Sequence, residues 1–239
     1  FQKLYHLGMM AIQTTTCQTA DKGFISAGIV NGFPPISIQV VKTDSMGTFE
    51  WARSYSTSEF VAVGYPACIR QTSDGGYIIA GEYSSAFTSD RPYLLKITST
   101  GSVSWSRRYG NKPGVANYVK QTSDGGYIFT GSVDDGSKND STSIYLVKTA
   151  SNGALTWDRV FKLSSTDDDV GAAVEIVSDG YVLTGSTTQI FGTDTTYDIV
   201  MIKTDLSGTH QWTRTFGEDA YSEDGADIEL LSGGGFLLT

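Results

Sequence analysis

The sequence predicts an all-β fold, a β-propeller of four-stranded antiparallel blades, and three observations predict it. A unit of about fifty residues recurs through all 239 positions, and self-similarity at this period is typical of propellers. Each unit contains short segments of alternating apolar and polar residues, separated by turns rich in Asp, Gly and Ser. No segment has the periodicity of a helix. Four-stranded units that repeat without helices are typical of propeller blades.

The first recurring element is a strand, a tight turn and a second strand. It reads QTSDGGYIIAGEYSS from Gln71 and QTSDGGYIFTGSVDD from Gln121, with weaker copies from Gln18, Ile176 and Leu230. The SDGG segment predicts a hairpin in which glycine supplies the positive φ that such turns require. In the second copy, the predicted strands cover residues 67–73, 77–84, 93–98 and 102–109.

The second recurring element is a hairpin of the form K-T-D-x-x-G, followed by a strand that carries a tryptophan. The tryptophans are Trp51, Trp105, Trp157 and Trp212, spaced 54, 52 and 55 residues apart. Phe1 stands 50 residues before Trp51, where a fifth tryptophan would fall.

Two of these motifs resemble known propeller sequences. The D-x-x-G-x-x-x-W spacing from Asp44 to Trp51 resembles the tryptophan-docking motif of quinoprotein-type propellers. The SDGGYI element is similar to the DGGY-type repeats of secreted and surface propeller proteins of microbes. The resemblance covers the whole chain and implies that each indole wedges against the neighbouring blade, which is a structural role. It implies little about function, because such repeats occur in proteins with unrelated roles.

We expect a single propeller domain over residues 1–239. Its predicted parts are complete blades at 13–56, 66–109, 116–161 and 171–216, and a partial blade at 227–239. Residues 1–8 would be the outermost strand of a closing or preceding blade. The chain is then either a five-bladed ring or a fragment of a larger propeller, and its end in the middle of a strand favours the fragment.

Residues that recur in every blade are expected to serve the fold. The lysines Lys42, Lys96, Lys148 and Lys203 would pair with the hairpin aspartates Asp21, Asp74, Asp124 and Asp179. The innermost strands would place Cys17, Arg70, Lys120, Glu175 and Glu229 near the central channel, where their mixed charges favour ion pairs between blades. Cys17 and Cys68 lie in neighbouring inner strands, and whether they form a disulfide stays open.

Two sets of loops vary between the repeats, and loops on a rigid scaffold are where binding residues concentrate. One set connects successive blades, at 56–66, 110–116, 162–170 and 217–226. The other connects the second and third strands, at 31–35, 85–92, 134–143 and 187–198. We expect the two sets on opposite rims of the disc.

The first set of loops carries an acidic cluster in adjacent blades. Its members are Asp167, Asp168, Asp169, Glu218, Asp219, Glu223 and Asp224. Calcium takes six to eight oxygen ligands, which converging carboxylates supply, so these residues are a candidate calcium site. Their spacing matches no EF-hand loop, and solvated acidic surface is the alternative.

Charge and composition exclude several classes of function. A net charge of −9 argues against binding to nucleic acid or to anionic membranes. No apolar run approaches the ~20 residues that membrane insertion by a helix requires. His6 and His210 are the only histidines, and both fall on the outermost strand or its hairpin, so no Ser-His-Asp triad is predicted. We identify no catalytic residue and no cofactor site, with calcium as the one candidate ion.

These observations predict a non-enzymatic propeller at the cell surface or outside the cell, used for binding or scaffolding. Its partner would be a protein or a glycan bound on a loop rim. Self-assembly, or completion of the partial blade by a strand from another chain segment, would cover its exposed strand edge. The alternative is an enzyme, either a quinoprotein-like oxidoreductase or a hydrolase acting on polysaccharide.

Overall fold

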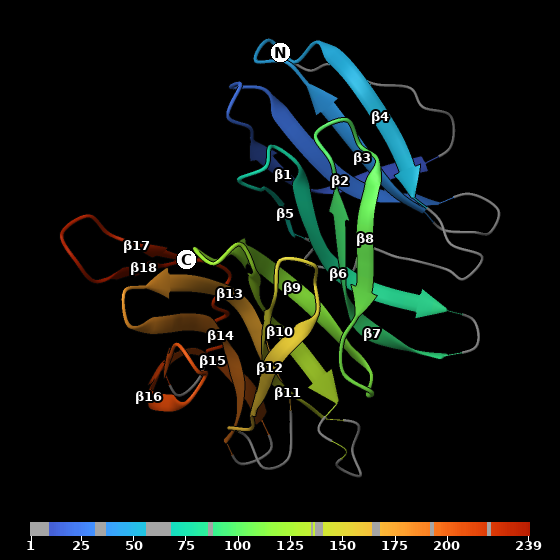
Figure 1. The fold of residues 1–239 in the computed structure, drawn as a ribbon. Helices are drawn as coiled ribbons and strands as arrows, with labels where there is room; N and C mark the ends of the chain where they lie inside the picture. The colour runs from blue at the N-terminus through green and yellow to red at the C-terminus, as the bar shows by residue number, and fades with distance from the viewer. Residues whose placement is uncertain are drawn as a thin grey trace.

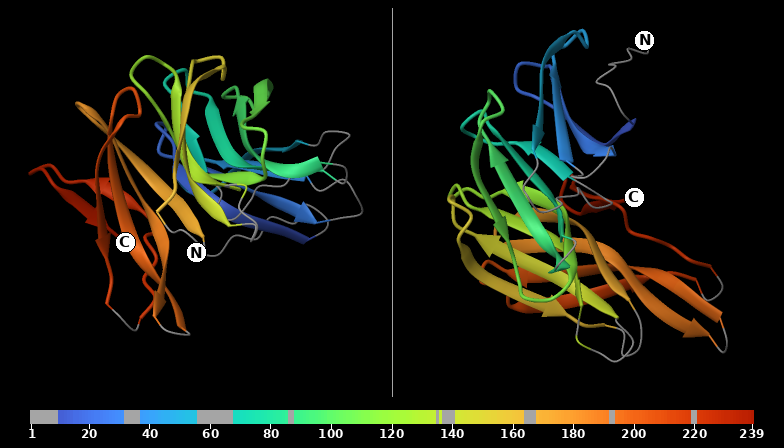
Figure 2. Two further views of the ribbon diagram at one scale, coloured as in Figure 1. Left: turned by 90° about the horizontal axis from the view of Figure 1, so that it is seen from below. Right: turned by 90° about the vertical axis from the view of Figure 1, so that its right-hand side faces the viewer.

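The computed structural model describes residues 10–31, 37–55, 68–85, 88–134, 136, 141–163, 168–191, 194–218 and 221–239. These residues form strands β1 to β18 and no helix. The strands are arranged in four four-stranded sheets and a fifth sheet of two strands, all antiparallel. The sheets follow one another in an arc, with chain order preserved from blue to red in Figures 1 and 2. The fold is a β-propeller, as the sequence predicts.

Within each sheet the strands pair with their neighbours in chain order, so every blade is a meander. The first blade comprises β1 (Met10–Gln18), β2 (Phe24–Asn31), β3 (Ser37–Thr43) and β4 (Phe49–Tyr55). The second comprises β5 (Cys68–Gln71), β6 (Tyr77–Ser85), β7 (Thr88–Ile97) and β8 (Val103–Arg108). The third comprises β9 (Gly114–Gln121), β10 (Tyr127–Asp134), β11 (Thr142–Thr149) and β12 (Leu155–Phe161). The fourth comprises β13 (Asp169–Val177), β14 (Gly180–Phe191), β15 (Asp194–Asp205) and β16 (His210–Phe216), and the fifth β17 (Ile228–Leu230) and β18 (Phe236–Leu238).

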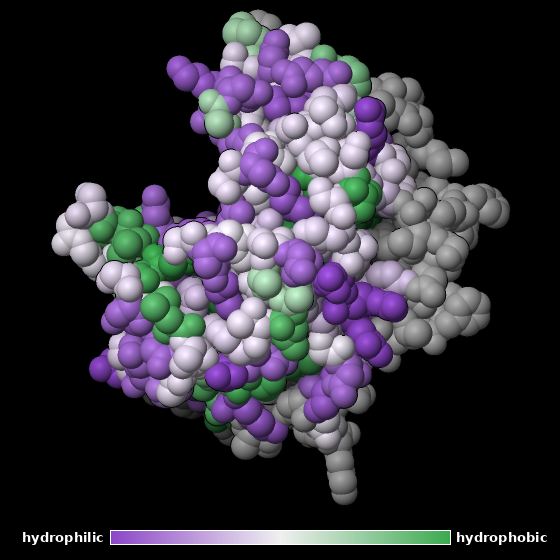
Figure 3. Space-filling model, viewed as in Figure 1, coloured by the Kyte–Doolittle hydropathy of each residue, from purple (hydrophilic) through white to green (hydrophobic). Residues whose placement is uncertain are grey.

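The innermost strands of successive blades contact one another, from β1 through β5, β9 and β13 to β17. A notch separates the first blade from the β17–β18 hairpin in the space-filling view of Figure 3. Residues 1–8, which we expect to form an outermost strand, lie outside the described residues. The five-bladed ring and the larger propeller therefore both remain predictions. None of the described segments forms a helix of the length and apolarity needed to cross a bilayer.

Two of the predicted loops are partly strand. β14 continues to Phe191 and β15 begins at Asp194, so most of the predicted loop at 187–198 is a long hairpin. Thr188 pairs with Tyr197 and Ile190 with Thr195 in this hairpin. These β-branched and aromatic residues favour extended structure, which explains why pairing continues beyond the blade. β7 likewise begins at Thr88, inside the predicted loop at 85–92.

The hydrophobic core consists of layers between adjacent blades. Ile25 and Val40 of the first blade pack in one cluster with Ile79 of the second. Equivalent clusters join the second blade to the third, the third to the fourth, and the fourth to Ile228 of the fifth. The second and third strands of a blade are covered on both faces, so their residues form continuous buried runs. β10 and β11 show this pattern, whereas the outermost β12 alternates between exposed and partly buried residues.

Each tryptophan strand packs on the blade that follows it. The Trp105 ring lies 5.6 Å from the ring of Tyr127 in the next blade. Gly153, at φ 77°, leaves the space for this indole, because a Cβ there would lie 2.6 Å from Trp105 Cζ3. The Tyr109 hydroxyl donates to the Gly153 carbonyl at 2.8 Å. Trp51 pairs in the same way with Tyr77 at 6.2 Å, and Trp157 with Tyr181 at 5.9 Å, while Trp212 packs on the cluster of the fourth and fifth blades.

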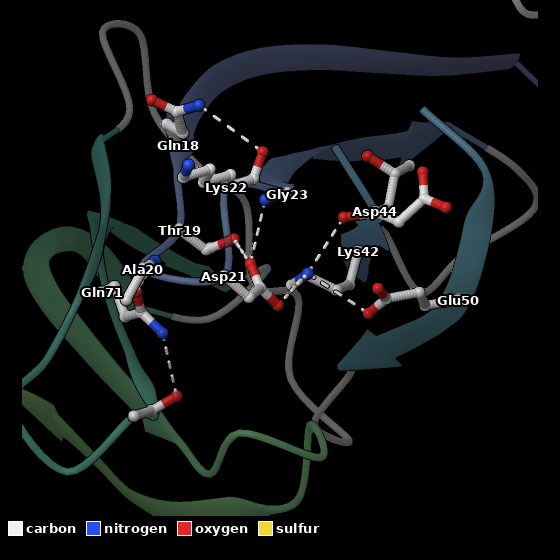
Figure 4. A network of polar contacts seen from close by, with 12 residues as sticks. Gln18, Thr19, Ala20, Asp21, Lys22, Gly23, Lys42, Asp44, Glu50 and Gln71 are labelled. Carbon is white, nitrogen blue, oxygen red and sulfur yellow. Dashed lines mark hydrogen bonds and ion pairs between the residues drawn. The ribbon is translucent and has the colours of Figure 1, made fainter. Parts of the chain in front are cut away.

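A buried lysine closes the first hairpin of each of the four complete sheets, as the sequence predicts. In the first blade, shown in Figure 4, Lys42 Nζ lies 2.9 Å from Asp21 Oδ2, and also donates to the Thr43 carbonyl at 2.9 Å. Asp21 in turn accepts hydrogen bonds from the Gly23 amide and the Thr19 hydroxyl. The same ion pair recurs between Lys96 and Asp74 at 2.9 Å, Lys148 and Asp124 at 2.8 Å, and Lys203 and Asp179 at 3.0 Å.

Glutamines of the QT pair join neighbouring blades. The Gln71 side-chain carbonyl accepts from the Ala20 amide, and that of Gln121 accepts from the Ser73 amide, each at 2.7 Å. The fourth blade has Ile176 at this position. There the Lys120–Glu175 ion pair joins the third and fourth blades, which confirms the expected pairing of charges along the inner strands.

These ion pairs predict how stability depends on pH. The hydrogen bond from Lys148, with that from Thr122, lowers the pKa of Asp124 to about 2. Burial alone would raise the pKa of Asp74, but hydrogen bonds from Thr72 and Lys96 lower it to about 2. A carboxyl whose pKa is lower in the folded state contributes stability that is lost as pH falls from about 4 to about 2.

We therefore expect the urea midpoint to fall over that pH interval, and to fall less in the Asp74→Asn/Asp124→Asn double variant. The matched control is Asp224→Asn, at an exposed position outside the ion pairs. Parallel pH profiles for the double variant and the wild type would refute this role of the aspartates.

Candidate functional site

Both sets of variable loops lie on one face of the propeller, so the expectation of opposite rims is wrong. The Tyr109 amide, at the end of the second blade, donates to the Pro92 carbonyl of the β6–β7 hairpin at 2.8 Å. The Asp134 amide donates to the Pro113 carbonyl at 2.8 Å, and the Glu223 amide to the Tyr197 carbonyl at 2.7 Å. The reason is that antiparallel strands reverse direction at each turn. Connections after the second and the fourth strand therefore end on the same side.

The recurring SDGG and K-T-D-x-x-G hairpins occupy the opposite face. The sequence repeats there because every blade needs the same lysine–aspartate ion pair to close its first hairpin. The repeats differ on the other face, which we call the loop face. It consists of the connections between blades and of the β2–β3, β6–β7, β10–β11 and β14–β15 hairpins. A site that is specific to this chain is therefore expected on the loop face.

Two members of the predicted acidic cluster bind protein groups on the loop face. The buried Asp169 carboxylate accepts from the Leu163 amide at 2.7 Å and from the Thr187 hydroxyl at 2.6 Å. Asp168 accepts from the Thr142 amide at 2.8 Å and from its hydroxyl at 3.1 Å, which ties the fourth blade to the third. Both carboxylates thus join chain segments by hydrogen bonds.

The remaining members lie in the segment that leads into β17 or outside the described residues. Glu218 and Asp224 are exposed, and Glu223 is partly buried with one carboxylate oxygen, Oε2, unpartnered. Asp167 and Asp219 lie outside the described residues. Among the residues that are described, no group of three or more His, Cys, Asp or Glu side chains could hold a metal ion. Calcium binding by this cluster stays a prediction.

Of the residues expected near the channel, Arg70 and Lys120 contact the Tyr118 ring, whereas Glu229 is exposed. The Arg70 guanidinium lies 4.7 Å from the centre of the Tyr118 ring. Cys17 and Cys68 are both free thiols, and burial raises the pKa of each, so they remain protonated at neutral pH. His210, on the outermost strand as expected, is exposed and hydrogen-bonds Thr213 at 2.8 Å. None of these groups has the arrangement of a catalytic triad.

A pair of carboxyl groups on the second blade was not predicted from the sequence. Glu82 lies near the end of β6 and pairs with Pro92, and Asp90 stands two residues before Pro92 on β7. The β6–β7 register shifts between Tyr83 and Ser85, opposite Asp90, and the Asp90 charge is close enough to raise the pKa of the Glu82 carboxyl group. Glu82 has the parity of Ile78 and Ala80, which pack against the third blade.

The surroundings of Glu82 favour its protonated form. Burial raises the pKa of Glu82, and the nearby negative charge of Asp90 raises it further. A carboxyl group whose pKa is raised in this way is suited to act as the acid of a site. The pair lies at the loop face, at the junction of the second and third blades.

A pocket of about 370 Å³ opens at the same junction. Its walls are the connection at residues 110–112 and side chains of β10, β11 and β12. The Tyr145 hydroxyl, at its base, donates to Asp158 at 2.6 Å. The pocket holds both carboxylate and ammonium groups, from Asp134, Asp158, Lys112 and Lys162.

Comparison with known proteins gives structural matches only. No protein-family model and no curated protein sequence matches the chain. An α-L-arabinofuranosidase from Fusarium graminearum, solved with an iminosugar inhibitor, has a TM-score of 0.61 at 9% identity, over 95% of this chain and 74% of its own. A xylan β-1,4-xylosidase from Bacillus halodurans C-125 has a TM-score of 0.50 at 14% identity, over 92% of this chain and 46% of its own. At these identities the likeness establishes the shared fold.

These matches correct the leading functional prediction. The two matches named above are an arabinofuranosidase and a xylosidase, which counts against the prediction of a non-enzymatic binding or scaffolding module. They favour its alternative, a hydrolase acting on polysaccharide. A pair of carboxyl groups suffices for glycoside hydrolysis, but with 26 acidic residues in the sequence chance pairs are abundant, so the sequence alone singles out no pair.

Proposed function

We propose that this chain is a hydrolase that cleaves glycosidic bonds in a polysaccharide, with Glu82 and Asp90 as its acid and base. The observation that carries the proposal is the proximity of these two carboxyl groups on the paired strands β6 and β7 at the loop face. The names of the proteins that share the fold, an arabinofuranosidase and a xylosidase, support the choice of substrate class.

The chemistry requires one protonated and one ionised carboxyl group on either side of the scissile bond. Glu82, whose pKa is raised by burial, donates its proton to the glycosidic oxygen as the bond to the anomeric carbon breaks. Asp90 acts as the carboxylate. Water supplies the hydroxyl that ends on the anomeric carbon, and its proton restores Glu82 over the full cycle. No other group or co-reactant is needed.

A polysaccharide substrate agrees with the predicted location outside the cell or at its surface, which stays a prediction. The resemblance to DGGY-type surface propellers is likewise a prediction, as are self-assembly and completion of the fifth blade. A hydrolase of this kind would present the loop face to the polymer, since the opposite face is occupied by the recurring hairpins.

The proposal is tested by incubating the full chain with arabinan, arabinoxylan and xylan and measuring the reducing ends released. We expect release from at least one of these polymers, with a linear dependence on enzyme concentration. Absence of release from all three, by protein whose circular dichroism shows a folded β-structure, would contradict the proposal.

A further inference from the structure

The pocket at the rim of the third blade contains a buried hydroxyl without a partner. Ser143 is fully buried and lines the pocket, and its Oγ has no hydrogen-bond partner among the described residues. Most buried hydroxyls in proteins are hydrogen-bonded, because leaving one unpaired costs free energy. The Ser143 hydroxyl can therefore donate to, or accept from, a group that enters the pocket.

A second polar group is fixed in the same wall. Burial raises the pKa of Tyr145, and its hydrogen bond to Asp158 raises it further, so the phenol stays protonated and donates. Only one lone pair of the Asp158 carboxylate is used in this bond. The remaining lone pairs can accept hydrogen bonds from ligand hydroxyls.

The other wall groups complete a site with donors, acceptors and an apolar surface. Lys112 and Lys162 supply ammonium donors, and Asp134 supplies a second carboxylate, which accepts from the Gly136 amide at 2.5 Å. Val133 and Val160 supply apolar surface. Two lysines and two aspartates balance in charge, so the pocket favours neither an anionic nor a cationic ligand.

Two charged groups of the pocket, Asp158 and Lys162, are specific to the third blade. Asp158 occupies the position at which the other blades carry Ala52, Ser106 and Thr213, as the strand registers show. Lys162 follows Phe161, whereas Gly110 and Gly217 follow the equivalent residues of the second and fourth blades. The fold does not require these side chains, because three other blades form without them.

We propose that this pocket binds one neutral sugar unit and so serves as a specificity site for a polysaccharide chain. Sugar hydroxyls both donate and accept, which matches mixed carboxylate, ammonium and serine groups. The C–H face of a sugar ring matches the two valines. The choice of ligand rests on the proposed function, but the binding itself does not require turnover. The pocket and the Glu82–Asp90 pair both lie at the junction of the second and third blades, so one polymer could contact both.

The test is calorimetric titration of the Glu82→Gln variant, which is used so that cleavage does not disturb binding. The neutral probes are xylotetraose and arabinotetraose, and the acidic probe is trigalacturonate. We expect a neutral probe to bind, and Ser143→Ala to weaken it about 5-fold to 10-fold. Because Ser143 Oγ has no hydrogen-bond partner in the part of the chain that the structure describes, Ser143→Ala should leave Tm unchanged. Asp158→Asn should weaken binding about 10-fold.

The matched control is Ser104→Ala, which removes an exposed serine hydroxyl from β8, outside the pocket, and should leave affinity unchanged. Equal affinity of the pocket variants and their parent, preference for trigalacturonate, or binding of no probe would each overturn the proposal. Saccharide binding that depends on Ser143 and Asp158, with no cleavage by the wild type, would instead refute the hydrolase and keep the sugar site.

Discussion

Replacing Glu82 by glutamine is expected to lower kcat/KM on the cleaved polysaccharide by about 10²-fold to 10⁴-fold, the range found when a general acid is removed. Glutamine has the shape of the acid but cannot give a proton to the leaving oxygen. Initial rates of reducing-end release, measured under conditions where rate is proportional to substrate, give this ratio directly. Asp90→Asn is expected to cause a loss of similar size, because the same mechanism needs its carboxylate.

The control for this prediction is Glu229→Gln, an exposed residue of the innermost strand β17. It changes the net charge by the same amount and should leave kcat/KM within a factor of about two. If Glu82→Gln and Glu229→Gln retain the same rate, the acid of the reaction lies elsewhere.

Replacing Trp105 by alanine is expected to lower the free energy of unfolding by about 3 kcal/mol, the low end of the range for large aromatic residues. The indole is partly exposed, but it fills the space above Gly153 and packs edge-on against Tyr127. Its removal opens a cavity between the second and third blades. Urea unfolding followed by far-ultraviolet circular dichroism measures the loss, since this signal does not depend on tryptophan.

Val103→Ala is the matched control, because Val103 lies on the same strand and is 55% exposed. Its cost should stay below about 0.5 kcal/mol. A Trp105→Ala variant as stable as Val103→Ala would show that the indole does not hold the blades together.

The sequence predicts the fold well because the same physical need recurs in every blade. The SDGG turn, the buried lysine and the tryptophan–glycine contact each appear several times, so one misread copy does not change the conclusion. Boundaries were less accurate where pairing extends past the blade. The β14–β15 hairpin continues to Phe191 because its threonines and aromatic residue favour strand, although the segment was expected to be loop.

The arrangement of the loops was predictable but was argued wrongly. In a four-stranded meander, the connection after the second strand and the connection to the next blade must end on the same side. Counting strand directions would have placed both variable sets on one face. That error separated residues that the structure brings together, such as Asp134 and the connection at 110–113.

The candidate site was missed because the search followed clusters of acids along the chain. The feature of the sequence that marks this site is a residue that differs from the residues at the same position of the other repeats. After the recurring Ala-Gly or Thr-Gly pair, the second blade carries Glu82, where the others carry Ile29, Ser132 and Ser186. Asp158 is a similar departure in the W-x-R segment. What the sequence could not supply is the burial of Glu82 and its place beside Asp90, which arise only when β6 and β7 pair.

The pH dependence of kcat/KM, measured for the wild type and for Glu82→Gln, tests the central claim most directly. Glu82 must be protonated to act as the acid, and its pKa lies above the usual value for glutamate. Activity should therefore fall on the alkaline side as pH rises through that elevated pKa. We predict that this limb disappears from the residual activity of Glu82→Gln. An alkaline limb that stays at the same pH and steepness in the variant would contradict the account.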